Sequence, residues 1–206
     1  MGAEDLPGGL AGAVDRLTDE FGGVFSRETV QACVADSHSR LGEARIAQYQ
    51  PLLAYRFARE RLKASAKANG LAPSDAPEIL FVCTRNAARS QLAAALLAHR
   101  SGGRVVVRSA GTDPAPEVDP DVLAALAEIG VDAGEAFPKP LTDETVTAAD
   151  VVVTMGCGDA CPVLPGRRYV DWDLPDPAGQ SLGAVRDVRD RIDDLVGRLL
   201  ADLGTA

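Results

Sequence analysis

The 206-residue sequence predicts an α/β fold, in which a doubly wound, four-stranded parallel sheet follows a small three-helix bundle. Two patterns support this prediction. After residue 78, short apolar runs alternate with segments of helical periodicity, as in parallel sheets with helices on both faces. Before residue 70, apolar residues recur only at helical spacing. The change of pattern predicts an N-terminal module over 1–70, a linker over 71–77 and a larger domain over 78–206.

The N-terminal module carries three apolar stripes that we expect to face a common core. Their members are Leu10, Ala13, Val14, Leu17 and Phe21, then Val30, Cys33 and Val34, then Tyr49, Leu52, Leu53 and Phe57. Ser26 with Glu28 just after it predicts a helix start, and Asn69-Gly70 predicts a helix end. Three short helices bury little area, so we expect them to pack on the larger domain or on a second copy of the chain.

The larger domain is expected to contain four strands and three helices. The predicted strands are Ile79–Val82, Arg104–Arg108, Asp150–Met155 and Tyr169–Asp171. The predicted helices are Ser90–Arg100, Asp119–Ile129 and Leu182–Leu203. The run Ile79–Val82 is continuously apolar, as in a strand that is buried on both faces.

The charge distribution argues against several partners. The formal net charge is −9, and all of it falls after residue 70, because residues 1–70 hold nine acidic and nine basic side chains. An acidic domain disfavours nucleic acid and anionic membrane surfaces. The sequence has no apolar stretch of roughly 18 residues and no start typical of a signal peptide, so we expect a cytoplasmic protein without a membrane partner.

The cysteines do not predict a metal site. They form no paired CxxC clusters, and only two histidines accompany them; these residues are Cys33, Cys83, Cys157, Cys161, His38 and His99. A zinc site needs such clusters, so no metal is predicted. Cys33 lies on the apolar stripe of the second helix and is expected to belong to the core.

The segment from Cys83 to Ser90 carries the chemistry. A buried strand ends at Cys83, five residues intervene, and a helix is expected to begin at about Arg89. Cys83 therefore lies at the carboxyl end of a parallel strand, where such sheets bind ligands. The intervening backbone N–H groups and the helix N-terminus suit a tetrahedral oxyanion, which the planar fork of Arg89 can grip. The same dipoles, with Arg89 and the Ser90 hydroxyl, favour the thiolate of Cys83 as an attacking group.

A simpler interpretation is a buried strand-end cysteine with an unrelated surface arginine. The spacing Cys-x5-Arg-Ser between a strand and a helix favours the functional interpretation. It predicts Cys83, Arg89 and Ser90 as catalytic residues. The oxyanion would be bound by the loop that consists of Thr84, Arg85, Asn86, Ala87, Ala88 and Arg89.

The sequence LFVCTRNAARSQLAAALL resembles the phosphate-binding loop of the low-molecular-weight tyrosine phosphatases and of the arsenate reductases built on the same fold. The resemblance covers Glu78 to the C-terminus and includes RSAGT, ADVVVTM and DWDLPDPAG. It implies the low-molecular-weight phosphatase type of sheet. The family usually has Gly at position 85 and often Cys or Gly at position 88, so Arg85 places a second cation at the rim. Some relatives hold potassium partly through a glutamate, but Ala94 stands there, so that site is not predicted.

The resemblance implies a general acid. Asp176, in LPDPAG, matches the residue that donates a proton to the leaving oxygen, although an Asp-Pro pair by itself is ordinary turn chemistry. Tyrosine phosphatases of this fold usually carry tyrosines after the Asp-Pro, whereas Pro177, Ala178 and Gly179 follow here. This difference favours an arsenate reductase over a phosphatase, which hydrolyses phosphomonoesters through a cysteinyl-phosphate. An anion-sensing module without turnover is a third interpretation.

Cys157 and Cys161 follow another buried strand and therefore lie near Cys83. A spacing of four residues can close a disulfide if the segment curls into a turn. Thioredoxin-coupled arsenate reductases resemble this segment, which implies a relay in which Cys83, Cys157 and Cys161 exchange a disulfide. No bound cofactor is implied; an external thiol reductant, thioredoxin or mycothiol with mycoredoxin, would regenerate the enzyme. Two inert thiols, or direct attack by a small thiol, are the alternatives. Similar fusions imply a homodimer formed through the N-terminal helices.

Overall fold

The structure is a computed structural model, which describes residues 9–42, 49–72, 76–157, 161 and 163–204. The chain divides into two compact units, Met1–Ser74 and Asp75–Ala206. Residues 73–75 of the predicted linker lie outside the described residues. Within the described part of the chain, no helix is both long and apolar enough to span a membrane.

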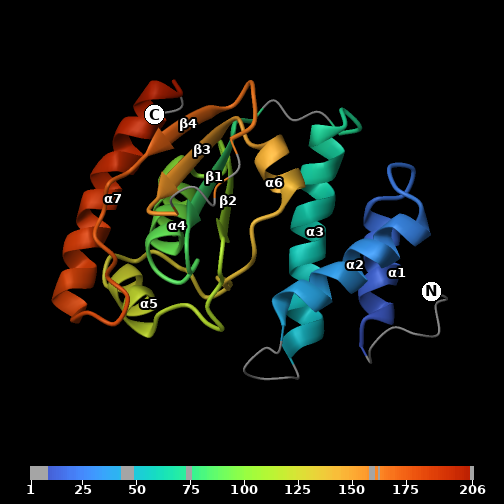
Figure 1. Cartoon of the computed structure of the whole chain (residues 1–206), viewed down its shortest axis with the longest axis horizontal. Helices are drawn as coiled ribbons and strands as arrows, with labels where there is room; N and C mark the ends of the chain where they lie inside the picture. Colours follow the sequence, from blue (N-terminus) through green and yellow to red (C-terminus); the bar gives the residue numbers. More distant parts are fainter. Residues whose placement is uncertain (1–8, 43–48, 73–75, 158–160, 162, 205–206) are drawn as a thin grey trace. The chain divides into compact units, whose positions relative to one another are not determined.

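The N-terminal unit consists of three helices, α1 (Ala11–Glu20), α2 (Arg27–Leu41) and α3 (Gln50–Ala68) (Figure 1). The predicted start of α2 is confirmed, because the Ser26 side chain accepts a hydrogen bond from the Thr29 N–H and thereby caps the helix. An ion pair between Arg59 and Glu20 joins α3 to α1. The hydrogen bond from Arg59 lowers the pKa of Glu20, so the pair remains charged at neutral pH.

The core of this unit combines the predicted stripes of α1 and α2 with a face of α3 that differs in part from the prediction. Ala54, Phe57 and Leu62 of α3 are buried. Tyr49 and Leu52, predicted to face the core, are 50% and 45% exposed. The prediction was wrong for these two because the buried face of α3 begins one turn later, where small alanines allow close helix packing. Cys33 is partly buried against the same cluster.

The second unit contains the predicted four-stranded parallel sheet, and its strands lie in the order β2-β1-β3-β4. The strands are β1 (Glu78–Cys83), β2 (Val106–Gly111), β3 (Val151–Met155) and β4 (Arg168–Asp171). All neighbouring pairs are parallel, so the carboxyl ends of the strands lie at one edge. The strand β2 begins and ends later than predicted, because the small residues Ser109, Ala110 and Gly111 pair with the end of β1.

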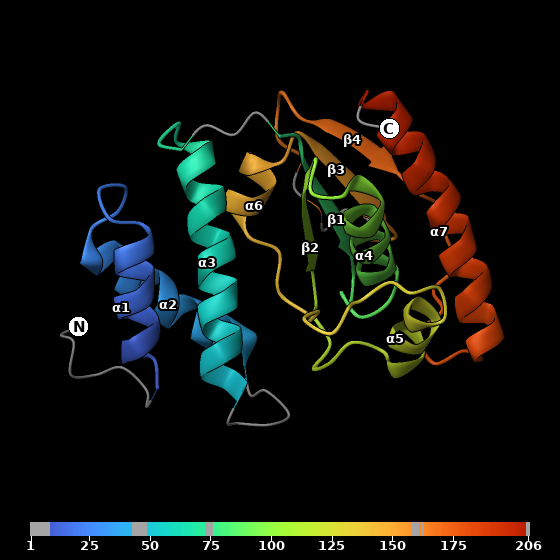
Figure 2. The same ribbon diagram turned by 180° about the vertical axis from the view of Figure 1, so that it is seen from behind.

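Helices cover both faces of the sheet (Figure 1, Figure 2). One face packs against α4 (Arg89–Ser101), α5 (Pro120–Ala127) and α7 (Leu182–Asp202), whose apolar residues share a core with Ile79 and Phe81. The other face, with Leu80 and Val82, packs against the short helix α6 (Asp143–Ala148). Helix α6 was not predicted from the sequence, because its six residues show no clear helical period. Alternation along β1 thus sends successive side chains to two different cores.

Candidate functional site

Cys83 lies at the carboxyl end of β1, between the ends of two neighbouring strands. Its backbone is in register with Gly111 of β2 and Met155 of β3, and its side chain is only 2% exposed. It belongs to the core that β1 shares with α4, α5 and α7. The predicted position of Cys83, at the strand end and just before a helix, is therefore the position that the structure shows.

The loop between Cys83 and α4 turns its carbonyl groups outward. The carbonyls of Thr84, Arg85 and Ala87 accept hydrogen bonds of 2.8–3.1 Å from backbone N–H groups of the segment 113–119. In a trans peptide unit, the carbonyl and the next N–H point in opposite directions. The N–H groups of Arg85, Asn86 and Ala88 therefore point into the loop, which is the arrangement that an oxyanion needs.

A close approach of β2 fixes the outer side of this loop. A side chain at Gly111 would place its Cβ 2.7 Å from the Thr84 carbonyl oxygen and 2.9 Å from the Asn86 Cβ. Only glycine fits at such a distance, because real Cβ atoms do not come that close to backbone oxygens. The RSAG segment that the sequence analysis used as a family feature thus has a steric role beside the loop.

Asn86 organises the inside of the loop. It has a φ of 46°, a left-handed conformation that is uncommon for residues with a side chain. Its carboxamide oxygen accepts hydrogen bonds from the Lys139 N–H at 2.9 Å and from the Gln91 side chain at 3.2 Å. The Gln91 amide also donates to the Phe137 carbonyl at 3.0 Å. Sequence reasoning missed Gln91 and Lys139, because nothing in the local pattern links the segment 137–139 to the loop.

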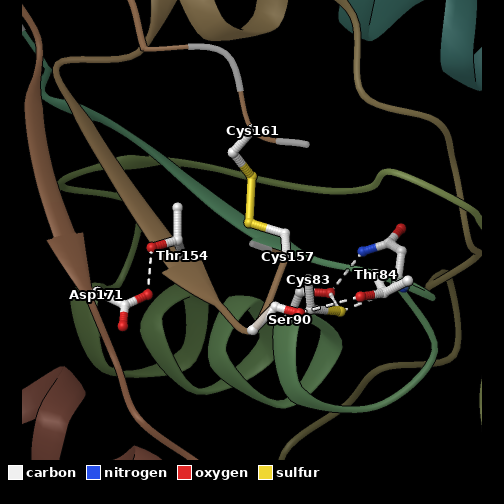
Figure 3. Close-up of a disulfide and its surroundings, with 9 residues drawn as sticks. Cys83, Thr84, Ser90, Thr154, Cys157, Cys161 and Asp171 are labelled. Carbon is white, nitrogen blue, oxygen red and sulfur yellow. Dashed lines mark hydrogen bonds between the residues drawn. A yellow bond between two sulfur atoms is a disulfide. The ribbon is translucent and has the colours of Figure 1, made fainter. Parts of the chain in front are cut away.

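Two donors converge on the Cys83 sulfur. The Asn86 N–H donates to it at 3.3 Å, and the Ser90 hydroxyl lies 3.0 Å away (Figure 3). Because the Ser90 oxygen accepts a hydrogen bond from the Asn86 side chain at 2.8 Å, its own proton is available for the sulfur. Ser90, which was predicted as a catalytic residue, therefore lies in contact with the Cys83 sulfur.

Helix α4 begins at the loop without a capping side chain. Its N-cap residue is Ala88, whose methyl group accepts no hydrogen bond, and Arg89, Ser90 and Gln91 in the first turn are all buried. The first N–H groups of a helix have no partner within the helix, and the positive end of its dipole points toward the loop. An anion in the loop is a suitable partner for these groups.

Arg89 reaches from the first turn of α4 across to the loop that contains Asp176. One guanidinium nitrogen donates to the Asp176 carboxylate at 2.7 Å and another to the Leu174 carbonyl at 3.3 Å. The third nitrogen, Nε, is buried and has no hydrogen-bond partner among the described residues. A buried donor without a partner is costly, and an oxyanion in the loop would satisfy it. The structure therefore brings Arg89 and Asp176 together.

The remaining cation of the loop, Arg85, lies at the rim. Its side chain is 53% exposed and lies 3.8 Å from the Asp113 carboxylate. Such an exposed pair contributes little to stability. Arg85 thus lies at the surface of the loop, whereas Arg89 lies buried beneath it.

Cys157 and Cys161 form a disulfide beyond the carboxyl end of β3, with a Cα–Cα distance of 6.2 Å (Figure 3). Cys157 is buried and belongs to the core on the α6 face of the sheet, where Cys161 packs beside it. Gly156, which joins β3 to Cys157, accepts a hydrogen bond from the Thr84 hydroxyl at 3.1 Å. A Cβ at Gly156 would lie 2.8 Å from the Arg89 guanidinium. The disulfide segment thus begins in contact with both ends of the loop 84–89, the candidate anion loop.

Two aspartates near the site, Asp171 and Asp176, each accept a hydrogen bond that fixes their own segment. Asp171 accepts a hydrogen bond from the Thr154 hydroxyl at 2.5 Å (Figure 3). Asp176 also accepts the Ala178 N–H at 3.1 Å, which fixes the turn after it. Among the described residues, no group of three or more His, Cys, Asp or Glu side chains is arranged to hold a metal ion.

Comparisons with known proteins agree with this geometry. Residues 78–206 match the family of low molecular weight phosphotyrosine protein phosphatases, and residues 10–66 match a protein-tyrosine-phosphatase-like N-terminal domain. A thioredoxin-dependent arsenate reductase of Corynebacterium glutamicum is 43% identical, with a TM-score of 0.86 over 95% of this chain and 96% of that one. A glutaredoxin arsenate reductase of Synechocystis is 33% identical over 61% of this chain and 98% of its own length. An arginine phosphatase from Geobacillus stearothermophilus is 30% identical, with a TM-score of 0.54 over 63% of this chain and 94% of that one.

Proposed function

Since the chain belongs to the low molecular weight phosphotyrosine protein phosphatase family, we propose that it is an arsenate reductase whose nucleophile is Cys83. One observation carries the proposal: a disulfide directly follows β3, and the strand beside β3 ends at a cysteine in an anion loop. Hydrolysis of a phosphoester needs the loop and an acid but has no use for a disulfide. The similarity to a thioredoxin-dependent arsenate reductase over the full length supports the same function.

In the first step, arsenate enters the loop and replaces the Asp176 carboxylate as the partner of Arg89. The inward N–H groups and the Arg89 Nε bind its oxygens, and the Cys83 thiolate attacks the arsenic atom. A new S–As bond forms and an As–O bond breaks, while Asp176, which takes up a proton from solvent once it has left Arg89, passes that proton to the departing oxygen, which leaves as water. The hydrogen bonds from Ser90 and Asn86 support the thiolate before this attack.

In the second step, the Cys157 thiolate attacks the Cys83 sulfur, and the electrons of the S–As bond remain on arsenic. Arsenate is thereby reduced to arsenite by two electrons, and a Cys83–Cys157 disulfide forms. Cys161 then attacks Cys157, which frees Cys83 and leaves the disulfide between Cys157 and Cys161. This last disulfide is the one present in the structure, which supports the relay. An external dithiol such as thioredoxin, or a mycothiol and mycoredoxin system, reduces it in a reducing compartment such as the cytoplasm.

A phosphatase is the second candidate. The loop, Arg89 and Asp176 are equally suited to form and hydrolyse a cysteinyl-phosphate, and the likeness to an arginine phosphatase favours this reaction. Pro177, Ala178 and Gly179 follow the acid and offer no aromatic surface for a phosphotyrosine ring. The phosphatase is therefore the weaker candidate for a tyrosine substrate.

A coupled assay separates the two functions. An arsenate reductase consumes NADPH with arsenate only when thioredoxin and thioredoxin reductase, or mycothiol, mycoredoxin and their reductase, are present. A phosphatase hydrolyses p-nitrophenyl phosphate rapidly without any reductant. NADPH consumption that depends on arsenate supports the proposal. If arsenate causes no NADPH consumption with either reductant system, while p-nitrophenyl phosphate is hydrolysed rapidly, the protein is a phosphatase and not an arsenate reductase.

Replacing Asp176 by asparagine is expected to separate binding from chemistry. Loss of the proton donor should lower the rate of arsenate reduction by about a hundredfold or more. Loss of its charge removes the anion that competes for Arg89, so sulfate should bind more tightly, as isothermal titration calorimetry measures. Asp173→Asn, at an exposed position in the same segment, is the matched control and should change neither quantity. An unchanged reduction rate in Asp176→Asn would contradict the assigned role of Asp176.

We also propose that the N-terminal helices join two copies of the chain. Tyr49 and Leu52, at the start of α3, expose half or nearly half of their surface in a unit too small to bury much apolar area. Light scattering on the full chain should give the mass of a dimer, and Tyr49→Ser with Leu52→Ser should give that of a monomer. Leu123→Ser, an exposed leucine of α5, is the control and should remain a dimer. A monomeric parent protein would exclude this assembly.

A further inference from the structure

Tyr169, a residue of β4 outside the anion loop, contacts the segment that follows the disulfide. Its hydroxyl accepts a hydrogen bond of 2.8 Å from the Leu164 backbone N–H, three residues after Cys161. Tyr169 and Leu164 both pack against the core that contains Cys157. Accordingly, we infer that Tyr169 is a positioning residue that holds the disulfide segment in its oxidised arrangement. This inference rests on the proposed function, in which the same segment carries the relay.

The strand register explains why Tyr169 lies on this side of the sheet. In β4, Tyr169 is in register with Val152 of β3, and Val170 is in register with Val153. Neighbouring residues in register point to the same face of a sheet. Val152 belongs to the core of Cys157, whereas Val153 belongs to the core of Cys83. Tyr169 therefore faces the disulfide and not the nucleophile.

The proposed relay requires this arrangement to change between redox states. Cys157 packs in the core on the α6 face, yet it must attack Cys83, whose side chain belongs to the opposite core. Gly156 joins Cys157 to β3 with a φ of 71° and provides the backbone freedom for such a turn. When the disulfide is reduced, Cys161 is no longer tied to Cys157, and we expect Leu164 to move away from the Tyr169 hydroxyl. The hydrogen bond to Leu164 therefore favours the oxidised form over the reduced form.

Tyr169→Phe tests this inference, since it removes the hydroxyl and retains the ring in the core. The full-length protein is equilibrated with oxidised and reduced dithiothreitol, and its free thiols are then alkylated and mapped by mass spectrometry. A hydrogen bond is worth about a factor of five in an equilibrium constant. The Cys157–Cys161 equilibrium should therefore shift about fivefold toward the dithiol, which corresponds to a potential about 20 mV less negative.

Two controls distinguish positioning from a general loss of stability. Tyr55→Phe, in the N-terminal unit and remote in sequence from the disulfide, should leave the equilibrium unchanged. The melting temperature of Tyr169→Phe should fall more in the oxidised than in the reduced protein, whereas a structural role would lower both equally. An unshifted equilibrium, or equal losses in both forms, overturns the inference. The test needs no arsenate, so a shifted equilibrium in a protein that cannot reduce arsenate overturns the proposed function and supports the role of Tyr169.

Discussion

Replacing Arg89 by lysine is expected to lower kcat/KM for arsenate by about a thousandfold, as the loss of a charge-stabilising donor does in other active sites. The variant keeps a positive charge but loses the planar fork that reaches Asp176 and the Leu174 carbonyl at once. It also loses the buried Nε, which has no hydrogen-bond partner among the described residues. Steady-state kinetics in the coupled assay measure the effect, and circular dichroism checks that the variant is folded.

Arg85→Lys is the matched control for this variant. Arg85 belongs to the same loop and carries the same charge, but its side chain is half exposed and its carboxylate partner lies 3.8 Å away. Lysine at the rim keeps the long-range attraction for an anion, so kcat/KM should change by less than about tenfold. If kcat/KM of Arg89→Lys also falls by less than about tenfold, the positive charge, rather than the geometry of Arg89, governs the reaction.

Replacing Cys161 by serine is expected to stop the reaction after one turnover. Arsenate should still be reduced once, because Cys83 and Cys157 suffice to expel arsenite. The Cys83–Cys157 disulfide then has no internal thiol to open it. Alkylation of free thiols after arsenate treatment, followed by mass mapping, should identify this disulfide in nearly all molecules, with one arsenite released per chain.

Cys33→Ser provides the control for the thiol chemistry. Cys33 belongs to the N-terminal unit, where its thiol donates to the Ala58 carbonyl at 3.8 Å, so turnover should be unaffected. If Cys161→Ser turns over as fast as the parent protein, the internal relay is excluded. A small thiol that attacks the arsenylated Cys83 directly would then replace it.

The sequence predicts the part of the site that is continuous in the chain. The apolar run before Cys83, the spacing to Arg89 and the helical period after it are local patterns. Each corresponds to an element that local physics specifies: a buried strand, a turn of backbone amides and a helix start. The four parallel strands were predictable for the same reason, because an alternation of strands and helices admits few topologies.

The contacts that complete the site could not be predicted, because they join segments that are distant in the sequence. The Lys139 N–H and the Gln91 side chain both hold Asn86, and Arg89 pairs with Asp176 across 87 positions. Tyr49 was wrongly placed in the core, since the sequence does not state where along α3 the packing begins. The role of Asp176 was suggested only by family resemblance, because Asp-Pro pairs are common in turns.

The nucleophile and the disulfide of the proposed cycle lie on opposite faces of the sheet. Cys83 belongs to one core of the sheet, and the Cys157–Cys161 pair belongs to the other. In the proposed cycle, arsenate thus reacts on one face of the sheet, and the external reductant reduces the disulfide on the other. The nucleophile is already restored when the disulfide awaits its electron donor, so a fresh oxyanion can occupy the loop in the meantime. In this cycle, the next oxyanion can therefore bind beside Cys83, at the end of the six-residue strand β1, while the disulfide is still being reduced.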